Sequence, residues 1–414
     1  IRIMGQIEIN HTGSGGGVVL SSDGTNLLLG GSAVGGGGGA SASDDLYAAS
    51  PSSATDPTAT GSNSVAIGSD AQATATNGSI AFGQATRATG NSTAAIGYVA
   101  NASGAGALAI GYTANAAASF SAAVGYNAKT ETGSGSVALG TSYASGASSF
   151  AAAITNNTSS YGATGSNSVA IGYQAKATGS KSVSIGERVN TTNSYSYSLG
   201  SQIDNGGQYS AVLSGYDVTI SGGLYNVAIG TTLDIDAVNG GMAFGNQSSV
   251  TKDYSMAFGR YAHTNIKGQF AFSGHSLGDG SMSSRANGCI YILYSDTTDA
   301  TAEAMTTTNS TAAADNQIAA PTNDTCIMFS GTIVAMQNGA ADQGGWEIKG
   351  LLKNDGGTTT LVNSNVQTFA EGNGWAVALS ADNTNNALKV QVTGEASHNI
   401  RWVANIQTSE VTYA

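Results

Sequence analysis

Charged residues, proline, cysteine and tryptophan are all scarce in this chain of 414 residues. Only 10% of the residues are charged, and 14 Lys and Arg stand against 26 Asp and Glu, which gives a net charge of -12. Such a chain lacks the basic surface that binds phosphate backbones, so we expect no nucleic-acid partner. No run of 18 apolar residues occurs either, so we expect no membrane insertion.

Two cysteines and four scattered histidines leave little material for a metal site. Cys289 and Cys326 are 37 residues apart, and two thiols alone cannot form a tetrahedral zinc site. We expect buried free thiols, with a disulfide as the alternative in an extracellular protein. The sequence has no Gly-x-Ser-x-Gly elbow in a nucleophile context, no His-Glu-x-x-His pair and no carboxylates in register within the repeats. We therefore expect no catalytic, cofactor-binding or metal-binding residues and no enzymatic activity.

Glycine, by contrast, is abundant, with 58 residues, and much of it belongs to a repeated phrase. Residues 64–68 read Ser-Val-Ala-Ile-Gly, and related copies return about every 14 residues as far as Gly274. Thr155, Ser214 and Ser273 take the glycine position in three weaker copies. The repeat glycines are Gly68, Gly83, Gly97, Gly111, Gly125, Gly140, Gly172, Gly186, Gly200, Gly230, Gly245 and Gly259.

The repeat predicts a β-solenoid. Alternation of large and small residues within each copy indicates strands, and 14 or 15 residues suffice for two strands of about five residues and two tight corners. Fifteen such turns make a narrow roll roughly 70 Å long, at about 4.8 Å per strand layer. Hexapeptide helices, wide right-handed helices and calcium-binding nonapeptide rolls fit this period and pattern less well.

The sizes of the residues on each strand predict a partner for the roll. Val65 and Ile67 are large, whereas Ser64 and Ala66 are small. We expect the large residues to point inward and the small ones to let a second chain approach, because each Å² of apolar surface buried by association contributes about 25 cal/mol. The alternative is that the Ser and Ala columns face water.

Tyrosine often follows the repeat glycine, at Tyr98, Tyr112, Tyr126 and Tyr173. Stacked turns would bring these rings about 4.8 Å apart, as an aromatic ladder or, alternatively, as a stripe for sugar contact. Between Glu187 and Asn239 the repeat is less regular. Repeat decay is the expectation there, and bulging loops on a binding face are the alternative.

The repeat resembles the head of the YadA-like trimeric autotransporter adhesins. Their phrase Asn-Ser-Val-Ala-Ile-Gly stands here at residues 63–68 and again at 167–172. The resemblance covers about half the chain and implies a left-handed parallel β-roll in a homotrimer that serves as an adhesive or spacing rod. Members also carry a secretion signal, a coiled-coil stalk and a membrane anchor, and these residues show none of the three patterns. Because Ile1 is not Met, we expect a fragment or a processed chain.

The segments before the repeat differ from it in composition. Residues 1–34 contain short predicted strands at 7–12, 17–20 and 27–29, and their Thr-Gly-Ser-Gly-Gly-Gly run resembles segments of phage fibres, which implies an attachment region. Residues 35–60 are rich in Gly, Ser and Ala and read as a connector.

After Gly274 the period stops, and residues 275–414 hold all three tryptophans and both cysteines. Alternating strands separated by turns predict an antiparallel β-sandwich or jelly roll. Residues 344–350, 375–382 and 400–404 resemble a terminal domain of tailed-bacteriophage fibres. We expect contacts through exposed aromatic residues and acidic loops such as 296–299, although the tryptophans alternate with apolar residues as core residues do. Such a loop could alternatively hold a hard cation.

These features predict an all-β virion protein, a trimeric phage tail or capsid fibre. The roll over 61–274 would be a rigid rod, and the C-terminal domain would meet a host glycan or protein, or another virion protein. One alternative is a bacterial surface adhesin, and a second is a fibre-borne polysaccharide depolymerase.

Overall fold

The structure is a computed structural model that describes residues 55–155, 159–275, 286–320, 324–339 and 342–413, and the backbone of four strands nearer the N-terminus. These four strands, β1 (Ile7–Ile9), β2 (Val18–Ser22), β3 (Leu27–Leu29) and β4 (Ser32–Ala33), form one antiparallel sheet in sequence order. Three of them lie where strands are predicted. Residues 1–56 and 57–414 are separate compact units, and most of the predicted connector lies outside the described residues.

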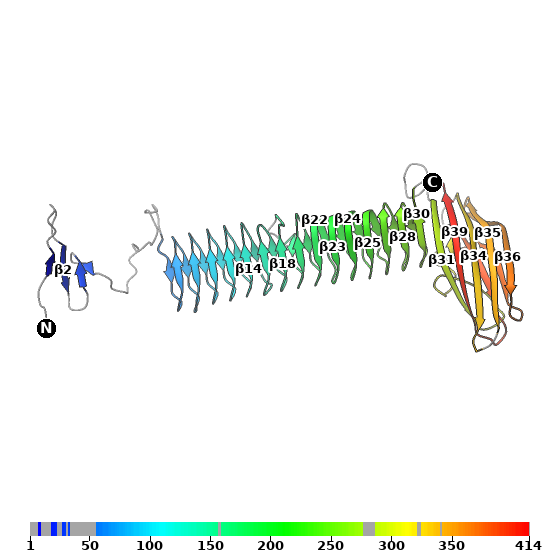
Figure 1. Ribbon diagram of the computed structural model, residues 1–414, viewed down its shortest axis with the longest axis horizontal. Helices are drawn as coiled ribbons and strands as arrows, with labels where there is room; N and C mark the ends of the chain where they lie inside the picture. Colours follow the sequence, from blue (N-terminus) through cyan, green and yellow to red (C-terminus); the bar gives the residue numbers. More distant parts are fainter. Residues whose placement is uncertain are drawn as a thin grey trace. The chain divides into compact units, whose positions relative to one another are not determined.

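A parallel β-solenoid runs from Thr58 to Ser273 (Figure 1). Each turn has a first strand before the glycine position and a second strand after it, and equivalent residues of successive turns pair in register, as Ala95 does with Ala109. Fifteen first-strand positions and no helix among the described residues confirm the predicted all-β solenoid of about fifteen turns.

The strands are short at both ends of the roll and long in its middle. The separate first strands are β6 (Val65–Ile67), β8 (Ile80–Phe82), β10 (Ala94–Ile96), β12 (Leu108–Ile110), β14 (Ala122–Val124), β16 (Val137–Leu139), β18 (Phe150–Ala152), β20 (Val169–Ile171), β26 (Met242–Asn246), β28 (Met256–Arg260) and β30 (Phe270–Ser273). The separate second strands are β5 (Thr58–Ala59), β7 (Gln72–Ala73), β9 (Arg87–Ala88), β11 (Asn101–Ala102), β13 (Asn115–Ala116), β15 (Lys129–Thr130), β17 (Tyr143–Ala144), β19 (Gly162–Ala163), β21 (Lys176–Ala177), β27 (Ser249–Val250) and β29 (His263–Thr264). In four turns the two merge as β22 (Val183–Thr191), β23 (Tyr197–Asn205), β24 (Ala211–Ile220) and β25 (Val227–Ile235).

The side chains of the first strands point the opposite way from the prediction. The small central residues, such as Ala81 and Ala109, are fully buried, whereas Ile80 and Phe82 on either side of Ala81 are 45% and 48% exposed. The core over residues 71–177 consists almost entirely of alanine. The prediction of large residues inside and small ones outside is therefore wrong, because alanines from both strands meet in these turns and leave no room for larger side chains between them.

Glycine is needed after the first strand because the backbones of successive turns meet there. Gly111 has φ +129°, which L side chains rarely adopt, and a Cβ on it would lie 2.2 Å from the carbonyl oxygen of Gly125. Gly97 stands in the same relation to Gly111, at 2.3 Å. Most of the repeat glycines thus form a column in which only hydrogen fits between one turn and the next, and Gly140 is an exception because a Cβ there would meet nothing within 4 Å.

In two of the weaker copies, the residue that takes the glycine position is not the predicted one. Ala152 pairs with Ile171, so that Ala153, with φ 56°, takes the position assigned to Thr155. Gly200 pairs with Gly215 across a bulge, so that Ser214 is an inserted residue. Ser273 pairs with Gly259, as predicted.

The turns over 183–235, predicted as decayed repeats, contain the longest strands of the roll. Their interior holds Val189, Ile203, Val218 and Leu233 in place of alanine. β-Branched and other aliphatic residues favour extended backbone, which agrees with strands that continue through the glycine corner. Bulges interrupt the pairing between Leu199 and Gly200 and near Ser214.

The C-terminal domain contains two antiparallel sheets over one core. The larger sheet has the order β31 (Ala286–Thr297), β39 (Ile400–Thr412), β34 (Thr325–Gln337), β35 (Gln343–Asp355), β36 (Thr358–Ala370). In the smaller sheet, β38 (Ala387–Thr393) pairs with β37 (Ala376–Asp382), β32 (Ala302–Ala304) and β33 (Ile318–Ala319). Buried residues of both sheets form one cluster, an arrangement that supports the predicted sandwich.

The aromatic and thiol side chains of this domain lie mainly in that core. Trp346, Trp375 and Trp402 are at most 2% exposed, and the ring of Trp402 lies 5.3 Å from that of Trp346 and 5.7 Å from that of Trp375. Cys289 belongs to the same core, and burial raises the pKa of its thiol. Cys326 is half-buried on the opposite face of the sheet, and both thiols are free. The alternative of a disulfide between Cys289 and Cys326 is therefore wrong.

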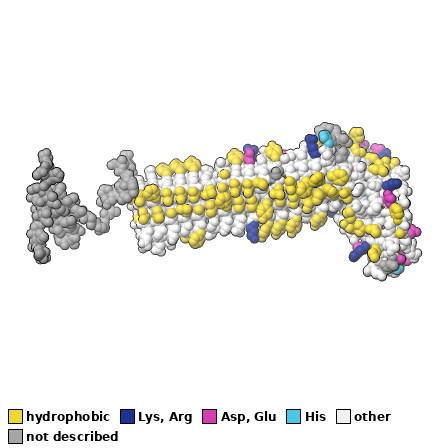
Figure 2. Space-filling model, in the orientation of Figure 1, with side chains coloured by type: hydrophobic (Ala, Val, Ile, Leu, Met, Phe, Trp, Pro, Cys, Tyr) yellow, Lys and Arg dark blue, Asp and Glu magenta, His cyan; other side chains and the backbone are white. Residues whose placement is uncertain are grey.

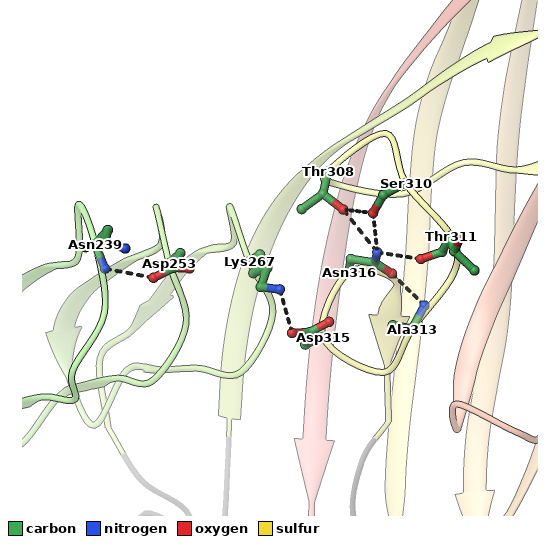
Figure 3. Close-up of polar contacts among 9 residues, drawn as sticks. All are labelled: Asn239, Asp253, Lys267, Thr308, Ser310, Thr311, Ala313, Asp315 and Asn316. Atoms are coloured by element: carbon green, nitrogen blue, oxygen red, sulfur yellow. Dashed lines mark hydrogen bonds and ion pairs between the residues drawn. The ribbon is translucent and has the colours of Figure 1, made fainter. Parts of the chain in front are cut away.

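The C-terminal domain covers the last turn of the roll. β30 pairs with β31, and Ile266 and Ala271 belong to the core of the domain. At the corner before the first strand, the backbone N–H of Asn239 donates to the carboxylate of Asp253 in the next turn (Figure 3). One turn after Asp253, the backbone N–H of Lys267 donates to the backbone carbonyl of Asp315 at 2.8 Å, and the Lys267 ammonium pairs with the Asp315 carboxylate at 2.9 Å. Asp315 belongs to a loop that the hydrogen bonds of Asn316 hold together. This loop thus pairs the backbone N–H and the ammonium of Lys267, which have no further turn of the roll beside them.

Candidate functional site

An apolar stripe runs along the outside of the roll (Figure 2). It consists of the residues on either side of the buried central residue in each first strand, from Val65 to Phe272, and successive copies pair in register. Its members include Val65, Ile80, Phe82, Leu199, Leu213 and Phe258, which are between 43% and 53% exposed.

The second strands present a polar outer face instead. Gln72, Arg87, Asn101, Asn115 and Lys129 occupy equivalent outward positions in successive turns. The Asn101 amide donates to the Asn115 side-chain oxygen at 3.1 Å, and Arg87 pairs with Asp70 at 3.2 Å. One outer face of the roll is therefore suited to water and the other is not.

The size of the apolar stripe, more than any single residue in it, indicates a contact surface. Soluble monomers rarely expose a contiguous apolar patch larger than a few hundred Å², and this stripe repeats on all fifteen turns. The stripe is consequently the surface of the roll best suited to contact with another protein chain.

The predicted tyrosines form a stack in three of four cases. The ring centroids of Tyr98 and Tyr112 lie 5.0 Å apart and those of Tyr112 and Tyr126 lie 5.3 Å apart, with 15° between the planes in both pairs. Tyr173 stands apart from this stack. Tyr112, the inner ring, has a neighbouring ring on each of its faces, so this ring is not open to stacking by a sugar.

A second stack of tyrosines was not predicted. Tyr195, Tyr209 and Tyr225 lie at the other corner of the roll, 5.0 and 5.3 Å apart, and the ammonium of Lys181 sits 4.7 Å from the Tyr195 ring centre. All three tyrosines have φ between 53° and 62°, which costs a bulky residue about 1–3 kcal/mol. The spacings of 14 and 16 residues are the signal that could have revealed them.

Replacing Tyr112 by serine is expected to lower the free energy of unfolding by about 1–2 kcal/mol, because the substitution removes both ring contacts of the first stack. The matched control is Tyr173→Ser, since Tyr173 is equally exposed and joins no ring stack in the described part of the chain. Chemical denaturation followed by tyrosine fluorescence measures both. Equal losses in the two variants would contradict a stabilising ladder.

A hollow lies at the end of the larger sheet away from the roll. Its volume is about 580 Å³, and the ends of β31, β34 and β39 bring Asp296, Met336, Gln337 and Arg401 to its wall. The Arg401 guanidinium pairs with Asp296 at 3.3 Å, and the side-chain oxygen of the nearly buried Gln337 has no hydrogen-bond partner among the described residues. The predicted acidic loop thus contributes Asp296 to a mixed polar and apolar recess.

The rest of that loop is ordered by its own contacts. The backbone N–H of Thr301 donates to the Asp299 carboxylate at 2.7 Å and lowers its pKa. Within the described ranges no three His, Cys, Asp or Glu side chains converge on one point. The same residues include no helix long and apolar enough to cross a membrane.

The comparisons with known proteins concern the roll. A model of the YadA head domain repeat, which holds two copies of the repeat, matches residues 59–78, 77–100, 102–128, 163–186 and 239–262. The unmatched stretches include the shifted copy near Ala153 and the aliphatic core of β23 to β25. A search of curated proteins finds no match. The roll is therefore similar to a YadA adhesin head, a likeness that indicates an adhesin-like fibre at an extracellular or surface location.

Proposed function

We propose that this chain is the rod of a homotrimeric fibre on a tailed-phage virion and that its C-terminal domain makes the attachment. The observation that carries the proposal is the apolar stripe, which is continuous along the roll (Figure 2), whereas the outward positions of the second strands are polar. Three chains that turn their stripes toward a common axis would bury them and leave the polar second strands in water. The YadA-like repeat supports the number three, since heads of that kind are typically trimeric.

The role is structural rather than enzymatic in this proposal. The roll acts as a spacer, and the hollow beside Asp296 and Arg401 lies at the far end of the C-terminal sheet, where a host glycan or protein, or another virion protein, can reach it. Three copies in one fibre would multiply a weak contact through avidity.

A bacterial surface adhesin fits the YadA-like repeat equally well. The virion is favoured by the C-terminal segments that resemble phage fibre domains.

Immunogold electron microscopy separates the two surface locations. An antibody raised against the purified chain is applied to particles and to cells of the source culture, with antibody preabsorbed on the chain as control. We expect gold on particles, at rods that carry a globular end. Gold confined to the bacterial envelope would replace the virion proposal by the adhesin alternative.

A further inference from the structure

The outer face of the larger C-terminal sheet carries an apolar patch that the core does not use. Tyr294 on β31 pairs with Val403 on β39, which pairs with Val334 on β34, so the three side chains form one row across three strands. They are 40%, 39% and 58% exposed, and Met336 beside them is 63% exposed. We call Tyr294, Val334 and Val403 the sheet patch; Met336 lies at its edge, in the wall of the hollow beside Arg401.

The sheet patch continues the apolar stripe of the roll. Phe270 of the last turn pairs with Ile290 of β31, and the two side chains lie on the same face because directly paired residues of antiparallel strands do so. The ring of Phe272 lies over Gly288, where a Cβ would come within 2.5 Å of it. From Ile290 the outward positions of β31 continue through Ile292 to Tyr294, so no polar residue interrupts this path.

The patch is confined to the strands nearest the roll. On β35, the fourth strand of the sheet, the outward residues Glu347, Lys349 and Lys353 are exposed and charged. The inner face of the same sheet is already covered by the smaller sheet. Apolar surface therefore follows β31 from the roll to Tyr294 and crosses there to Val403 and Val334, while the outward positions of β39 nearer the roll are the polar Asn405 and Gln407.

We propose that the sheet patch is an interface with a second copy of this chain, formed as an extension of the contact along the roll. This inference rests on the self-association in the proposed function. The surface is continuous, so a second copy that covers the stripe at Phe270 would lie next to Ile290 and Tyr294. This continuity favours a second copy as the partner of the sheet patch. The C-terminal domains are thereby held together and not hinged independently on the rod.

Alkylation of single cysteines in the full-length purified protein tests this interface. The background carries Cys326→Ser, and Cys289 is buried with a raised thiol pKa, so neither position reacts appreciably. Reporters are Val334→Cys in the sheet patch, Ile80→Cys in the stripe and Ala378→Cys, which lies exposed on the smaller sheet on the other side of the domain. Reaction with a maleimide is followed by mass spectrometry, and circular dichroism checks that each variant is folded.

We expect the thiols at 334 and 80 to react at least about tenfold more slowly than the thiol at 378, because a neighbouring chain must move away before a covered thiol reacts. The preparation contains no other protein, so protection at 334 reports a second copy. If position 80 is protected and position 334 reacts as fast as position 378, the sheet patch is free and this inference is wrong, while the proposed trimer stands. If both react fast, the proposed trimer fails as well.

Discussion

A chain in which Ile96 and Ile110 are both aspartate is expected to sediment as a monomer. Both residues lie in the apolar stripe, in adjacent turns, and they pair directly with each other. In a trimer with the stripe at its axis, the change places six carboxylates together in an apolar interior. An unpaired buried charge costs about 3–5 kcal/mol, which is more than a hundredfold in the association constant for each such residue.

The matched control puts the same charges on the polar face. Thr89 and Ser103 lie in adjacent turns, exposed just after the second strands β9 and β11. Thr89→Asp with Ser103→Asp should leave the sedimentation coefficient of the wild type unchanged. A stripe variant that keeps the wild-type mass, with circular dichroism showing a folded roll, would mean that the stripe is not the interface.

Gly111→Ala is expected to destabilise the roll by about 3 kcal/mol or more. A non-glycine residue at φ +129° costs about 1–3 kcal/mol in backbone strain. In addition, its Cβ would lie 2.2 Å from the Gly125 carbonyl oxygen, so the two turns would have to separate. Thermal unfolding followed by circular dichroism measures the loss, and hydrogen exchange should show faster opening of β12 and β14.

The control for this effect is Gly140→Ala, at the equivalent position of a later turn. Gly140 has φ +67°, and a Cβ there meets nothing within 4 Å. Alanine at this position should therefore lower the free energy of unfolding only by the strain of a left-handed backbone, about 1–2 kcal/mol. Equal losses at Gly111 and Gly140 would show that the contact between turns is not what requires glycine.

The period of the sequence was enough to predict the solenoid but not which residues fill it. Alternation has the same two-residue period whichever set faces inward, so Val65 and Ala66 are equally consistent with either orientation. The clue lay in the second strands, where Ala100, Ala102, Ala114 and Ala116 leave no large residue for the interior of those turns. A narrow core of alanine follows from both strands considered together.

The functional surfaces differ in how far the sequence could reveal them. The stack at Tyr98, Tyr112 and Tyr126 was visible because each tyrosine follows a repeat glycine. The stack at Tyr195, Tyr209 and Tyr225 was missed because these residues precede the first strand and do not follow a repeat glycine, and an insertion lengthens the step from Tyr209 to Tyr225. The hollow beside Asp296 was beyond prediction, because Gln337 and Arg401 reach it from strands distant in sequence.

The molar mass of the purified protein, measured by sedimentation equilibrium across a range of concentrations, tests the central claim most directly. Association through the apolar stripe predicts a single species of three times the 41.0 kDa chain mass. A species of 41.0 kDa at every concentration would contradict it, because the stripe would then face water along the whole roll.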